Sequence, residues 1–394
     1  MNILVLNAGS SSLKYQVIEM PSEMVKCVGL IERIGFDDAI FTHEKDAEKL
    51  SKTLPIKDHK IGLQKIAKTL LDDKIGVIKS VNEIDAVGHR VVHGGSKFSK
   101  TVIITEEVKN NIRELFDLAP LHNPANLMGI EIAETIFSSA KQIAIFDTAF
   151  HQTMPKVAYQ YAIPNSYLED HKIRAYGFHG TSHKYVSEKA IEYLGEKSKN
   201  LITIHLGNGC SMTAIKDGKS IETSLGLGPT NGLVMGTRAG DIDQSVIFFL
   251  MKKLNKSADE VNNLLQKKSG MLGLTSFSDL REIENEASKG NEDCINALQI
   301  AAYRIKKYIG AYTAILNGVD AIVFTAGIGE NSSLMRKLAS ENLGFLGIKL
   351  NENKNEIRSK EVREIQTEDS KVKILVIPTN EELEIAKQSY QLLK

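Results

Sequence analysis

A polar loop stands between two apolar segments at the start of the chain. Its residues run Asn7-Ala8-Gly9-Ser10-Ser11-Ser12-Leu13-Lys14. An amide, three hydroxyls and a lysine on one turn can face phosphate oxygens and the oxygen shell of Mg²⁺. A polar β-turn without a ligand is the commoner meaning of such a run. The loop therefore indicates a phosphate site only if other phosphate-binding residues accompany it.

An arginine stands in a second run that is bounded by glycines, Gly88-His89-Arg90-Val91-Val92-His93-Gly94-Gly95. An Arg that leaves a core strand toward a Gly-Gly turn is placed to clamp an anion with two parallel hydrogen bonds. His89 and His93 are four residues apart, but no acidic residue supports them as a zinc pair. Zinc is therefore the minority interpretation.

Two further side chains stand at the ends of predicted elements. Asp147 follows an apolar strand-like segment, and the carboxyl ends of such strands face the ligand in α/β sheets. A helix N-cap is an equal alternative for it. His179 precedes a predicted helix that Thr181 or Ser182 would cap, where it could join an anion site. Taken alone, such a histidine is more often a structural hydrogen-bonding group.

The stretch from Gly218 to Gly240 contains six glycines, counting both ends, and Arg238 stands near its end. A loop of this length in a compact chain is usually functional or disordered, and this one is too apolar for disorder. The sequence predicts a loop that carries Arg238 over a cleft and ends at Asp241, a plausible helix N-cap.

The common phosphate-binding motifs do not fit. Gly218-Lys219-Ser220 lacks the first glycine of a Walker A loop and is interpreted as a hairpin turn. No G-x-G-x-x-G follows the first predicted strand, and Gly327-Ile328-Gly329 lacks the third glycine. A P-loop NTPase and a Rossmann dehydrogenase are both disfavoured.

Short β-branched runs alternate with longer amphipathic stretches, which predicts an α/β fold. Strands are expected at 3–6, 13–18, 86–92, 143–146, 201–205, 211–215, 321–325 and 374–377. Helices are expected near 59–72, 105–116, 124–138, 181–194, 242–254, 279–288, 293–316, 332–342 and 380–393.

Three pairs of similar segments recur in the same order at similar separations. They are ILVLNAGSSSLKYQV with ITIHLGNGCSMTAI, IDAVGHRV with VDAIVFTA, and QIAIFDT with KILVIPT. The pairs predict a duplicated α/β unit, each copy opening with a hairpin whose turn is rich in Gly, Ser and Asn. Two lobes around a cleft, with one phosphate-facing turn from each, resemble the actin, sugar-kinase and Hsp70 superfold.

Bulk properties restrict the class of protein. The 394 residues suffice for two domains, and Lys plus Arg equals Asp plus Glu, at 49 each. This balance gives no support to nucleic-acid or membrane-surface binding. Cys27, Cys210 and Cys294 have no paired spacing, which favours a reducing compartment. With no secretion signal and no bilayer-length apolar run, we expect a cytoplasmic protein.

Taken together, the motifs closely resemble those of the acetate kinase family. The matching stretches are NAGSSSLKY, VGHRVVHGG, APLHNPANL, FDTAFH, YGFHGTSH, HLGNGCS, GPTNGLVMGTRAGDID, TAGIGENS and PTNEE. The resemblance implies a duplicated actin-like (ribonuclease H-like) fold with the active-site cleft between the lobes, a homodimer, and reversible transfer from ATP to acetate giving acetyl phosphate and ADP. Mg²⁺ would be needed, and Mn²⁺ could replace it. One lobe would span 1–150 with the helix 382–394, and the other 151–381 with most of the ATP site and the dimer interface.

The resemblance also implies roles for individual residues. Asn7 and Glu381 would hold magnesium, Lys14 would meet the nucleotide and Arg90 the substrate. Asp147 would be the catalytic carboxylate, and His179 and Arg238 would stabilise the transition state. The ATP site would comprise His205, Leu206, Gly207, Asn208, Gly209, Asp279, Leu280, Arg281, Gly327, Ile328, Gly329, Glu330 and Asn331. The acyl methyl would lie among Val92, Leu121, Phe178 and Pro229.

Two alternatives and one departure stay open. Leu280 replaces a residue that is often aromatic or Cys in the family. Because acetate needs no strong base at neutral pH, Asp147 is better assigned an orienting or magnesium-shell role. A propionate or butyrate kinase is the nearest rival, since one methylene is worth only about 1–3 kcal/mol. An actin- or Hsp70-like ATP-driven module is the rival from another class, disfavoured by Arg90, Asp147, His179 and Arg238 together.

Overall fold

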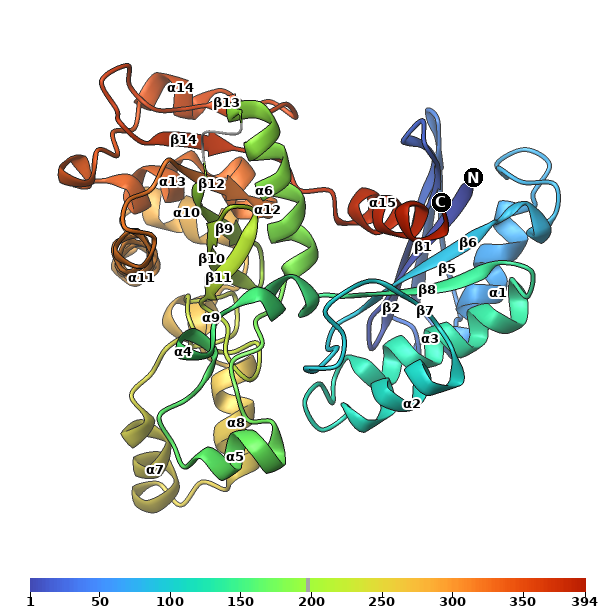
Figure 1. The fold of residues 1–394 in the computed structure, drawn as a ribbon, viewed down its shortest axis with the longest axis horizontal. Coiled ribbons are helices and arrows are strands. Elements are labelled where there is room, and N and C mark those ends of the chain that lie inside the picture. Colours follow the sequence, from blue (N-terminus) through green and yellow to red (C-terminus); the bar gives the residue numbers. More distant parts are fainter. Residues whose placement is uncertain (196–198) are drawn as a thin grey trace. The chain divides into compact units, whose positions relative to one another are not determined.

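The computed structural model describes residues 1–195 and 199–394. The chain divides into two compact units, Met1–Phe150 with Asn380–Lys394 (unit 1) and His151–Thr379 (unit 2). Each unit contains one mixed β-sheet covered by helices (Figure 1).

Unit 1 is built on an eight-stranded sheet with the order β5-β4-β3-β2-β1-β6-β8-β7. β1, β6 and β8 are parallel, and the remaining neighbours are antiparallel. The strands are β1 Asn2–Ala8, β2 Ser12–Glu19, β3 Met24–Glu32, β4 Ala39–Lys45, β5 Glu48–Leu54, β6 Ala86–Val91, β7 Val102–Ile103 and β8 Lys141–Phe146.

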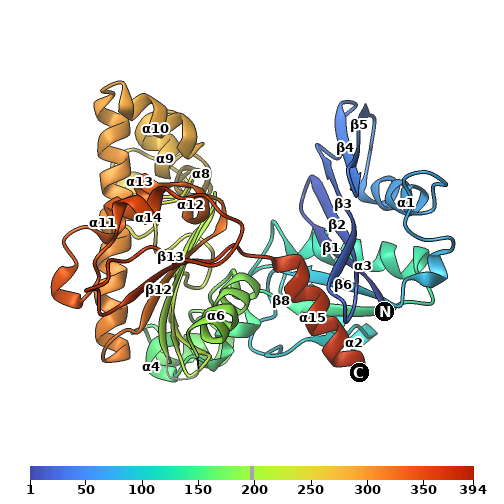
Figure 2. The ribbon, with the colours of Figure 1, turned by 90° about the horizontal axis from the view of Figure 1, so that it is seen from above.

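Helices cover both faces of this sheet. Ala133 of α3 and Phe137, which follows it, join the core cluster that contains Val87 of β6. The neighbouring residue Gly88 faces the other side, where a Cβ atom would lie 2.7 Å from Ile385 of α15. Figure 2 shows α15 lying across β1 and β6 on the side opposite α3. The helices of unit 1 are α1 His59–Leu70, η1 Val81–Glu83, α2 Glu106–Glu114, α3 Asn123–Ile136 and α15 Glu381–Leu393.

Unit 2 is built on a six-stranded sheet with the order β11-β10-β9-β12-β14-β13. β9, β12 and β14 are parallel. The strands are β9 Asn200–Leu206, β10 Cys210–Lys216, β11 Lys219–Thr223, β12 Ala321–Thr325, β13 Arg363–Glu364 and β14 Lys373–Val376. α6 and α11 lie on opposite sides of β9 (Figure 1).

Most of the remaining helices belong to unit 2, and η2 spans the point in the sequence where unit 2 begins. They are η2 Ala149–Thr153, α4 Lys156–Tyr159, α5 Asn165–His171, α6 Gly180–Leu194, α7 Gln244–Lys253, α8 Ala258–Lys267, α9 Gly270–Thr275, α10 Leu280–Ser288, α11 Glu292–Leu316, α12 Ala326–Asn331, α13 Ser333–Ser340, η3 Gly344–Leu346 and α14 Glu352–Glu356.

The duplication expected from the three repeated segments is visible in the sheet orders. The repeats place β1 with β9, β6 with β12, and β8 with β14. The order β3-β2-β1-β6-β8-β7 then corresponds strand by strand to β11-β10-β9-β12-β14-β13. Each copy opens with an antiparallel hairpin, followed by two parallel strands and an antiparallel edge strand. The predicted α/β class and its internal repeat are confirmed.

All eight expected strands and nine expected helices are present, with small shifts at their ends. The antiparallel extension β3 to β5 was not expected. β5 is mostly exposed and carries the run EKLSKTL, so it lacks the alternation of apolar and polar residues that marks a half-buried strand. The Gly218 turn is a hairpin turn, as predicted, because it joins the antiparallel strands β10 and β11.

Two predicted helix caps are wrong. α6 begins at Gly180, and its N-cap is His179 in the left-handed conformation, with φ of 56°, instead of Thr181 or Ser182. α7 begins at Gln244, and Asp243 caps it by accepting from the Ser245 N–H at 2.8 Å. Asp241 instead accepts a hydrogen bond from the backbone N–H of Gly232, so it shapes the preceding loop.

Candidate functional site

Three predicted site residues of unit 1 lie at the carboxyl ends of adjacent parallel strands. Asn7 is the last but one residue of β1, Arg90 the last but one of β6, and Asp147 follows β8 directly. β6 pairs with both β1 and β8, so the three ends share one edge of the sheet. The strand-end argument was made for Asp147, and the structure shows that Asn7 and Arg90 lie at the same edge.

Arg90 and Asp147 form an ion pair at this edge. The Nε and Nη2 atoms of Arg90 donate to Oδ2 of Asp147 at 2.9 and 2.6 Å. Asp147 is only 1% exposed, and its backbone N–H donates to the Val91 carbonyl. The carboxylate of Asp147 is therefore oriented toward Arg90 at the ligand edge of the sheet.

Glu381 brings a second carboxylate to Arg90. Glu381 is the first residue of α15, whose N-cap Asn380 accepts from the Leu383 N–H. The Oε2 atom of Glu381 lies 3.9 Å from Nε of Arg90. Burial raises the pKa of Glu381, and the neighbouring carboxylates of Asp147 and Glu382 raise it further, whereas Arg90 and Lys14 oppose them.

Lys14 lies opposite Asn7 in the register of the β1–β2 hairpin. Its Nζ atom contacts Glu382 Oε1 at 2.5 Å, and its side chain remains 44% exposed. Lys14 thus neutralises the residue next to Glu381 while keeping a face toward solvent, where the predicted nucleotide contact would form.

The donor set of unit 1 fits a hard divalent cation. Asn7 offers an amide oxygen, and Glu381 and Asp147 offer carboxylates. The raised pKa of Glu381 means that its ionised form lacks full compensation, so a cation beside it would be stabilised. Within residues 1–195 and 199–394, no three His, Cys, Asp or Glu side chains form a metal-binding group of their own. A site with few protein ligands and several waters is the pattern that Mg²⁺ usually shows.

The zinc interpretation of His89 and His93 gains no support. Nε2 of the buried His89 bonds to Gln142 Oε1 at 2.8 Å, and burial lowers its pKa to about 4. His93 is fully buried, and its Nδ1 accepts from the Gly95 N–H.

In unit 2, His179 and Arg238 come together beside the second polar hairpin turn. A Cβ atom on Gly209 would lie 3.4 Å from Nε2 of His179 and 3.5 Å from Nη1 of Arg238. Gly209 therefore leaves room for both cationic or donor groups at one point. The turn itself is closed by a hydrogen bond from the Gly207 N–H to the Gly209 carbonyl.

Arg238 is partly buried without a counter-charge. Its Nη1 donates to the Pro229 carbonyl at 3.0 Å and contacts Met235 Sδ at 3.6 Å. No carboxylate among residues 1–195 and 199–394 forms a salt bridge with it, and burial lowers its pKa. Arg238 is therefore not anchored through a surface ion pair with any carboxylate of the described residues.

Asp241 anchors the base of the loop that carries Arg238. It accepts from the Gly232 N–H at 2.7 Å and from the Tyr308 hydroxyl at 2.8 Å. Arg304 of α11 also donates to the carbonyls of Gly232 and Asp241. The loop thus rests on the long helix α11.

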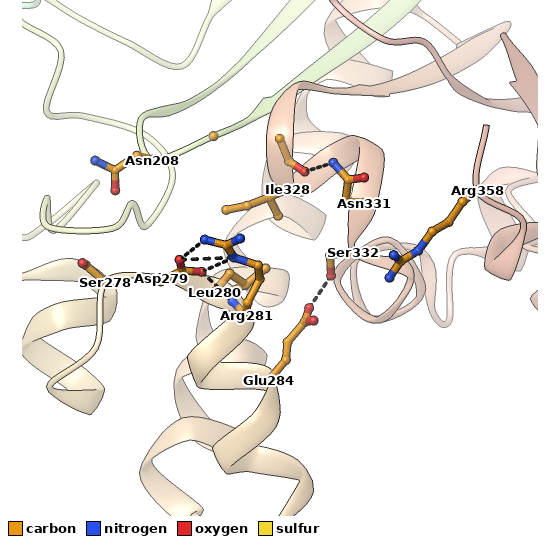
Figure 3. A pocket seen from close by; sticks show the side chains of 12 residues that line it. Asn208, Ser278, Asp279, Leu280, Arg281, Glu284, Ile328, Asn331, Ser332 and Arg358 are labelled. Atoms are coloured by element: carbon orange, nitrogen blue, oxygen red, sulfur yellow. Dashed lines mark hydrogen bonds and ion pairs between the residues drawn. The ribbon is translucent and has the colours of Figure 1, made fainter. Parts of the chain in front are cut away.

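A cavity of about 760 Å³ opens next to the Gly207 turn (Figure 3). Its lining includes eight residues of the predicted ATP site: Gly207, Asn208, Asp279, Leu280, Arg281, Gly327, Ile328 and Asn331. Five others of that set do not line it: His205, Leu206, Gly209, Gly329 and Glu330. Glu330 instead accepts from the Thr379 N–H at 3.1 Å.

Two charged groups of this cavity are held by neighbours. Arg281 forms a bidentate pair with Asp279, which also caps α10, and these hydrogen bonds lower the pKa of Asp279 to about 2. Glu284 accepts a hydrogen bond from the Ser332 hydroxyl (Figure 3). Leu280, the departure noted above, is buried and contributes apolar surface.

Four lining residues were not predicted from the sequence to belong to the ATP site: Ser278, Glu284, Ser332 and Arg358. Helical spacing could have found Glu284, since it lies four residues after Leu280 on α10. Ser332 and Ser278 are immediate neighbours of predicted positions. Arg358 follows α14 in an exposed loop, and no motif in the sequence indicates that it belongs to a site. It forms no ion pair with the other lining residues (Figure 3).

The residues predicted to surround the acyl methyl belong to different units. Val92 and Leu121 are in unit 1, and Leu121 is half exposed. Phe178 and Pro229 are in unit 2, where Phe178 is buried. The assembled methyl pocket stays a prediction.

The fold is a duplicated α/β unit with a polar cavity at a glycine turn. Beside that turn, Arg238 lies next to an imidazole and has no counter-charge among the described residues. These features define a phosphotransferase of the actin-like class. Residues 2–387 match the model of the Acetokinase family, and the chain belongs to this family.

Individual relatives cover the whole chain. The acetate kinase of Flavobacterium johnsoniae is 64% identical over 100% of both chains. The crystal structure of Porphyromonas gingivalis acetate kinase is 45% identical, covers 100% of both chains and has a TM-score of 0.95. The structure of a propionate kinase from Francisella tularensis is 43% identical over 98% of both chains, with a TM-score of 0.93. Among residues 1–195 and 199–394, every helix is too short or too polar to span a bilayer.

Proposed function

We propose that this protein is a Mg²⁺-dependent kinase that reversibly transfers the γ-phosphoryl group of ATP to acetate, giving acetyl phosphate and ADP. The observation that carries the proposal is Arg238, a partly buried guanidinium without a carboxylate partner in the described residues, beside Nε2 of His179. Phosphoryl transfer depends mainly on positioning and on neutralising the equatorial oxygens, which these two groups can supply.

The acceptor needs little activation. Acetate is ionised at neutral pH, so no general base has to remove a proton from it. In unit 1, Arg90 would attract the acetate carboxylate while Asp147 fixes the plane of the guanidinium. Asp147 is thus an orienting group in this proposal.

Asn7, Glu381 and Asp147 would hold Mg²⁺, directly or through water. When bound, the ion would neutralise charge on the phosphate oxygens. Mn²⁺ has the same preference for oxygen ligands and could replace it.

The nucleotide would occupy the cavity of unit 2. Gly327 and Ile328 at the start of α12 leave space for a flat base or a ribose. Arg358 adds positive charge to the lining, whereas the charge of Arg281 is balanced by Asp279. Leu280 and Ile328 would supply apolar contact in place of an aromatic residue.

Purified protein with ATP and Mg²⁺ should make acetyl phosphate from acetate, with propionate as a weaker acceptor and butyrate as a poor one. An acyl-phosphate assay with the three acids measures this directly. Propionate is the second candidate, because the propionate kinase quoted above is nearly as similar as the acetate kinase of P. gingivalis. Higher kcat/KM with propionate, or ATP turnover that no carboxylate accelerates, would contradict the proposal for acetate.

We also propose a homodimer. α7 carries the apolar run VIFFLM, yet none of its residues is buried, and Phe248 and Phe249 are 58% and 60% exposed. Tyr303 of α11 is 67% exposed. Exposed apolar side chains at this density are typical of protein interfaces. Light scattering that gives the mass of a single chain across micromolar concentrations would contradict this.

A cytoplasmic location is proposed as well. All three cysteines are free and buried, which suits a reducing compartment.

A further inference from the structure

Four histidines of unit 2 form a chain of ring contacts and hydroxyl hydrogen bonds around His179. His179 stacks on His205 with centroids 4.4 Å apart. The ring of His183 lies 6.0 Å from that of His205 and 5.8 Å from that of His151. The roles proposed above use His179 in the transition state, assign His205 to the ATP site by resemblance alone, and leave His183 and His151 without a role. The remaining members need another explanation, because buried polar networks cost stability wherever they are incompletely satisfied.

Ser211 is the link between two of these rings. Its Oγ lies 2.9 Å from Nδ1 of His179 and 2.6 Å from Nε2 of His183. Nδ1 of His183 lies 2.7 Å from the Thr203 hydroxyl. Ser211, His183 and Thr203 are all fully buried, so this row of groups is protected from water.

The proton count allows three arrangements. A serine hydroxyl has one proton and two lone pairs, so Ser211 can donate to at most one ring and can accept from both. Burial, followed by the proximity of His151 and His205, lowers the pKa of His183 well below its usual value, so that ring is neutral and has one N–H. Either His183 donates to Ser211 and Ser211 donates to His179, or both hydrogen bonds run in the opposite direction, or both rings donate to Ser211.

The three arrangements differ in which atom of His179 bears the proton at the anion site. In the first, Nδ1 of His179 accepts, and the neutral ring bears its proton on Nε2. In the other two, Nδ1 of His179 bears the proton, and Nε2 can donate only if the ring becomes a cation. Nε2 is the atom beside Gly209 and Arg238, so it would meet the phosphoryl oxygens.

The surroundings disfavour the cation. Arg238 already places a guanidinium beside the same glycine, and His205 stacks on the ring. His179 is also the N-cap of α6, and the positive end of a helix dipole opposes a further positive charge. The thiol of Cys210 next to this site is uncharged, because burial raises its pKa to about 12.

We propose that Ser211, held by His183, donates its hydroxyl proton to Nδ1 of His179 and so fixes the neutral tautomer whose Nε2–H faces the transferring phosphoryl group. Ser211 and His183 are positioning residues, and they act through His179. The inference rests on the proposed kinase function for its consequence in catalysis, but the tautomer itself is a property of the free protein.

Long-range ¹H–¹⁵N spectra of histidine-labelled protein test the tautomer without substrate. The His179 signals are assigned by their loss in His179→Asn. At pH 7 we expect the Nε2–H pattern in the wild type and a shift toward Nδ1–H or a mixture in Ser211→Ala. A wild-type ring that bears its proton on Nδ1, or on both nitrogens, would overturn the inference.

Kinetics test the consequence. Ser211→Ala should lower kcat by roughly ten- to a hundred-fold, while KM for ATP and acetate changes by less than about threefold. Ser220→Ala is the matched control, because Ser220 is equally buried and bonds to Nδ1 of His151 at 2.9 Å. It should leave kcat and the His179 signals near the wild type.

Ser211→Cys is the second variant in case the alanine variant does not fold. Its weakly donating thiol should give an intermediate kcat. Unchanged kcat and an unchanged His179 tautomer in a folded Ser211 variant would refute the proposal that Ser211 and His183 fix this tautomer. Wild-type protein that shows the Nε2–H tautomer but makes no acyl phosphate would support the proposed role of Ser211 and refute the kinase proposal. Failure of one proposal can therefore be distinguished from failure of the other.

Discussion

Arg90 donates two hydrogen bonds to a single oxygen of Asp147, at 2.9 and 2.6 Å, and Asp147 is 1% exposed. Removing one member of a buried ion pair costs about 3–5 kcal/mol, because the other charge stays in a poorly solvated site. Arg90→Leu should therefore lower the free energy of unfolding by about 3 kcal/mol, in addition to abolishing acetate turnover. Urea unfolding monitored by circular dichroism measures the first effect.

The control for Arg90→Leu is Arg113→Leu. Arg113 pairs with Glu131 on the surface, where both side chains are about half exposed, and such pairs contribute at most about 1 kcal/mol. Adding Asp147→Asn to Arg90→Leu should restore part of the lost stability. An Arg90 variant as stable as the Arg113 variant would show that the pair is electrostatically unimportant.

Glu381→Gln should stabilise the metal-free protein. Burial raises the pKa of Glu381 above its ordinary value of 4.5. A group with a raised folded-state pKa contributes its full stability below its ordinary pKa and loses it as pH rises through the folded-state pKa. The melting temperature of the variant should therefore exceed that of the wild type at about pH 7, and the difference should shrink toward about pH 4.

Mg²⁺ should reverse this difference. A ligand that binds only the native state raises its stability, so millimolar Mg²⁺ should raise the melting temperature of the wild type and leave Glu381→Gln unchanged. Glu382→Gln, which loses the Lys14 pair but not the proposed ligand, should still respond to Mg²⁺. An equal response of all three proteins would contradict the assignment of Glu381.

The strand-end rule explains why the sequence could place Asp147 at the ligand edge of a sheet. It needs only the position where a strand ends, which the hydrophobic pattern predicts. It could not show that Asp147 pairs with Arg90, because side-chain pairing depends on distances across the sheet.

The errors and omissions in unit 2 have a related cause. His179 was expected before a capped helix, but its left-handed backbone makes it the cap, and a non-glycine residue in that conformation leaves little trace in the sequence. Arg358 lies far beyond Leu280 in the chain, and only the folded structure brings both residues to one cavity. Backbone conformation at single positions and contacts between distant loops therefore needed the structure.

Glu222 gives unit 2 a pH-dependent contribution of its own. Burial raises its pKa to about 6, while the Thr223 N–H, which donates to Oε1, acts in the opposite sense. The contribution to stability is fully present below the ordinary pKa of 4.5 and is lost as pH rises through about 6. Glu222→Gln keeps the accepting oxygen and removes the charge. As pH rises from about 4.5 to about 8, the free energy of unfolding of this variant should therefore increase by about 1–2 kcal/mol relative to that of the wild type. Urea unfolding at the two pH values measures this, and a constant difference would contradict it.

Arg358 should act on nucleotide binding alone. It lines the cavity without pairing to the other lining residues, so its charge is available to an anionic ligand (Figure 3). Arg358→Ala should raise KM for ATP by roughly three- to tenfold, with KM for acetate unchanged and the effect weakened by salt. Arg33→Ala, which removes an arginine paired with Asp38 in unit 1, is the control and should change neither constant. Equal effects of the two variants would show that Arg358 does not belong to the nucleotide site.

Arg238 should act mainly on the transition state. Its guanidinium is partly buried, lacks a carboxylate partner in the described residues, and lies with Nε2 of His179 beside Gly209. Arg238→Ala should lower kcat by about 10³-fold or more and change KM for ATP far less. Arg238→Lys should recover little, because a point charge cannot replace the planar fork that also bonds to the Pro229 carbonyl.

Arg281→Ala is the contrasting variant for Arg238→Ala. The side chain of Arg281 is 90% exposed and paired with Asp279, so its loss should affect KM for ATP more than kcat. Steady-state kinetics with ATP and acetate varied in turn separate the two roles, because a transition-state group changes kcat whereas a binding group changes KM. A lysine variant of Arg238 with near wild-type kcat would show that Arg238 supplies only charge, and the fork geometry would then have no part in the transfer.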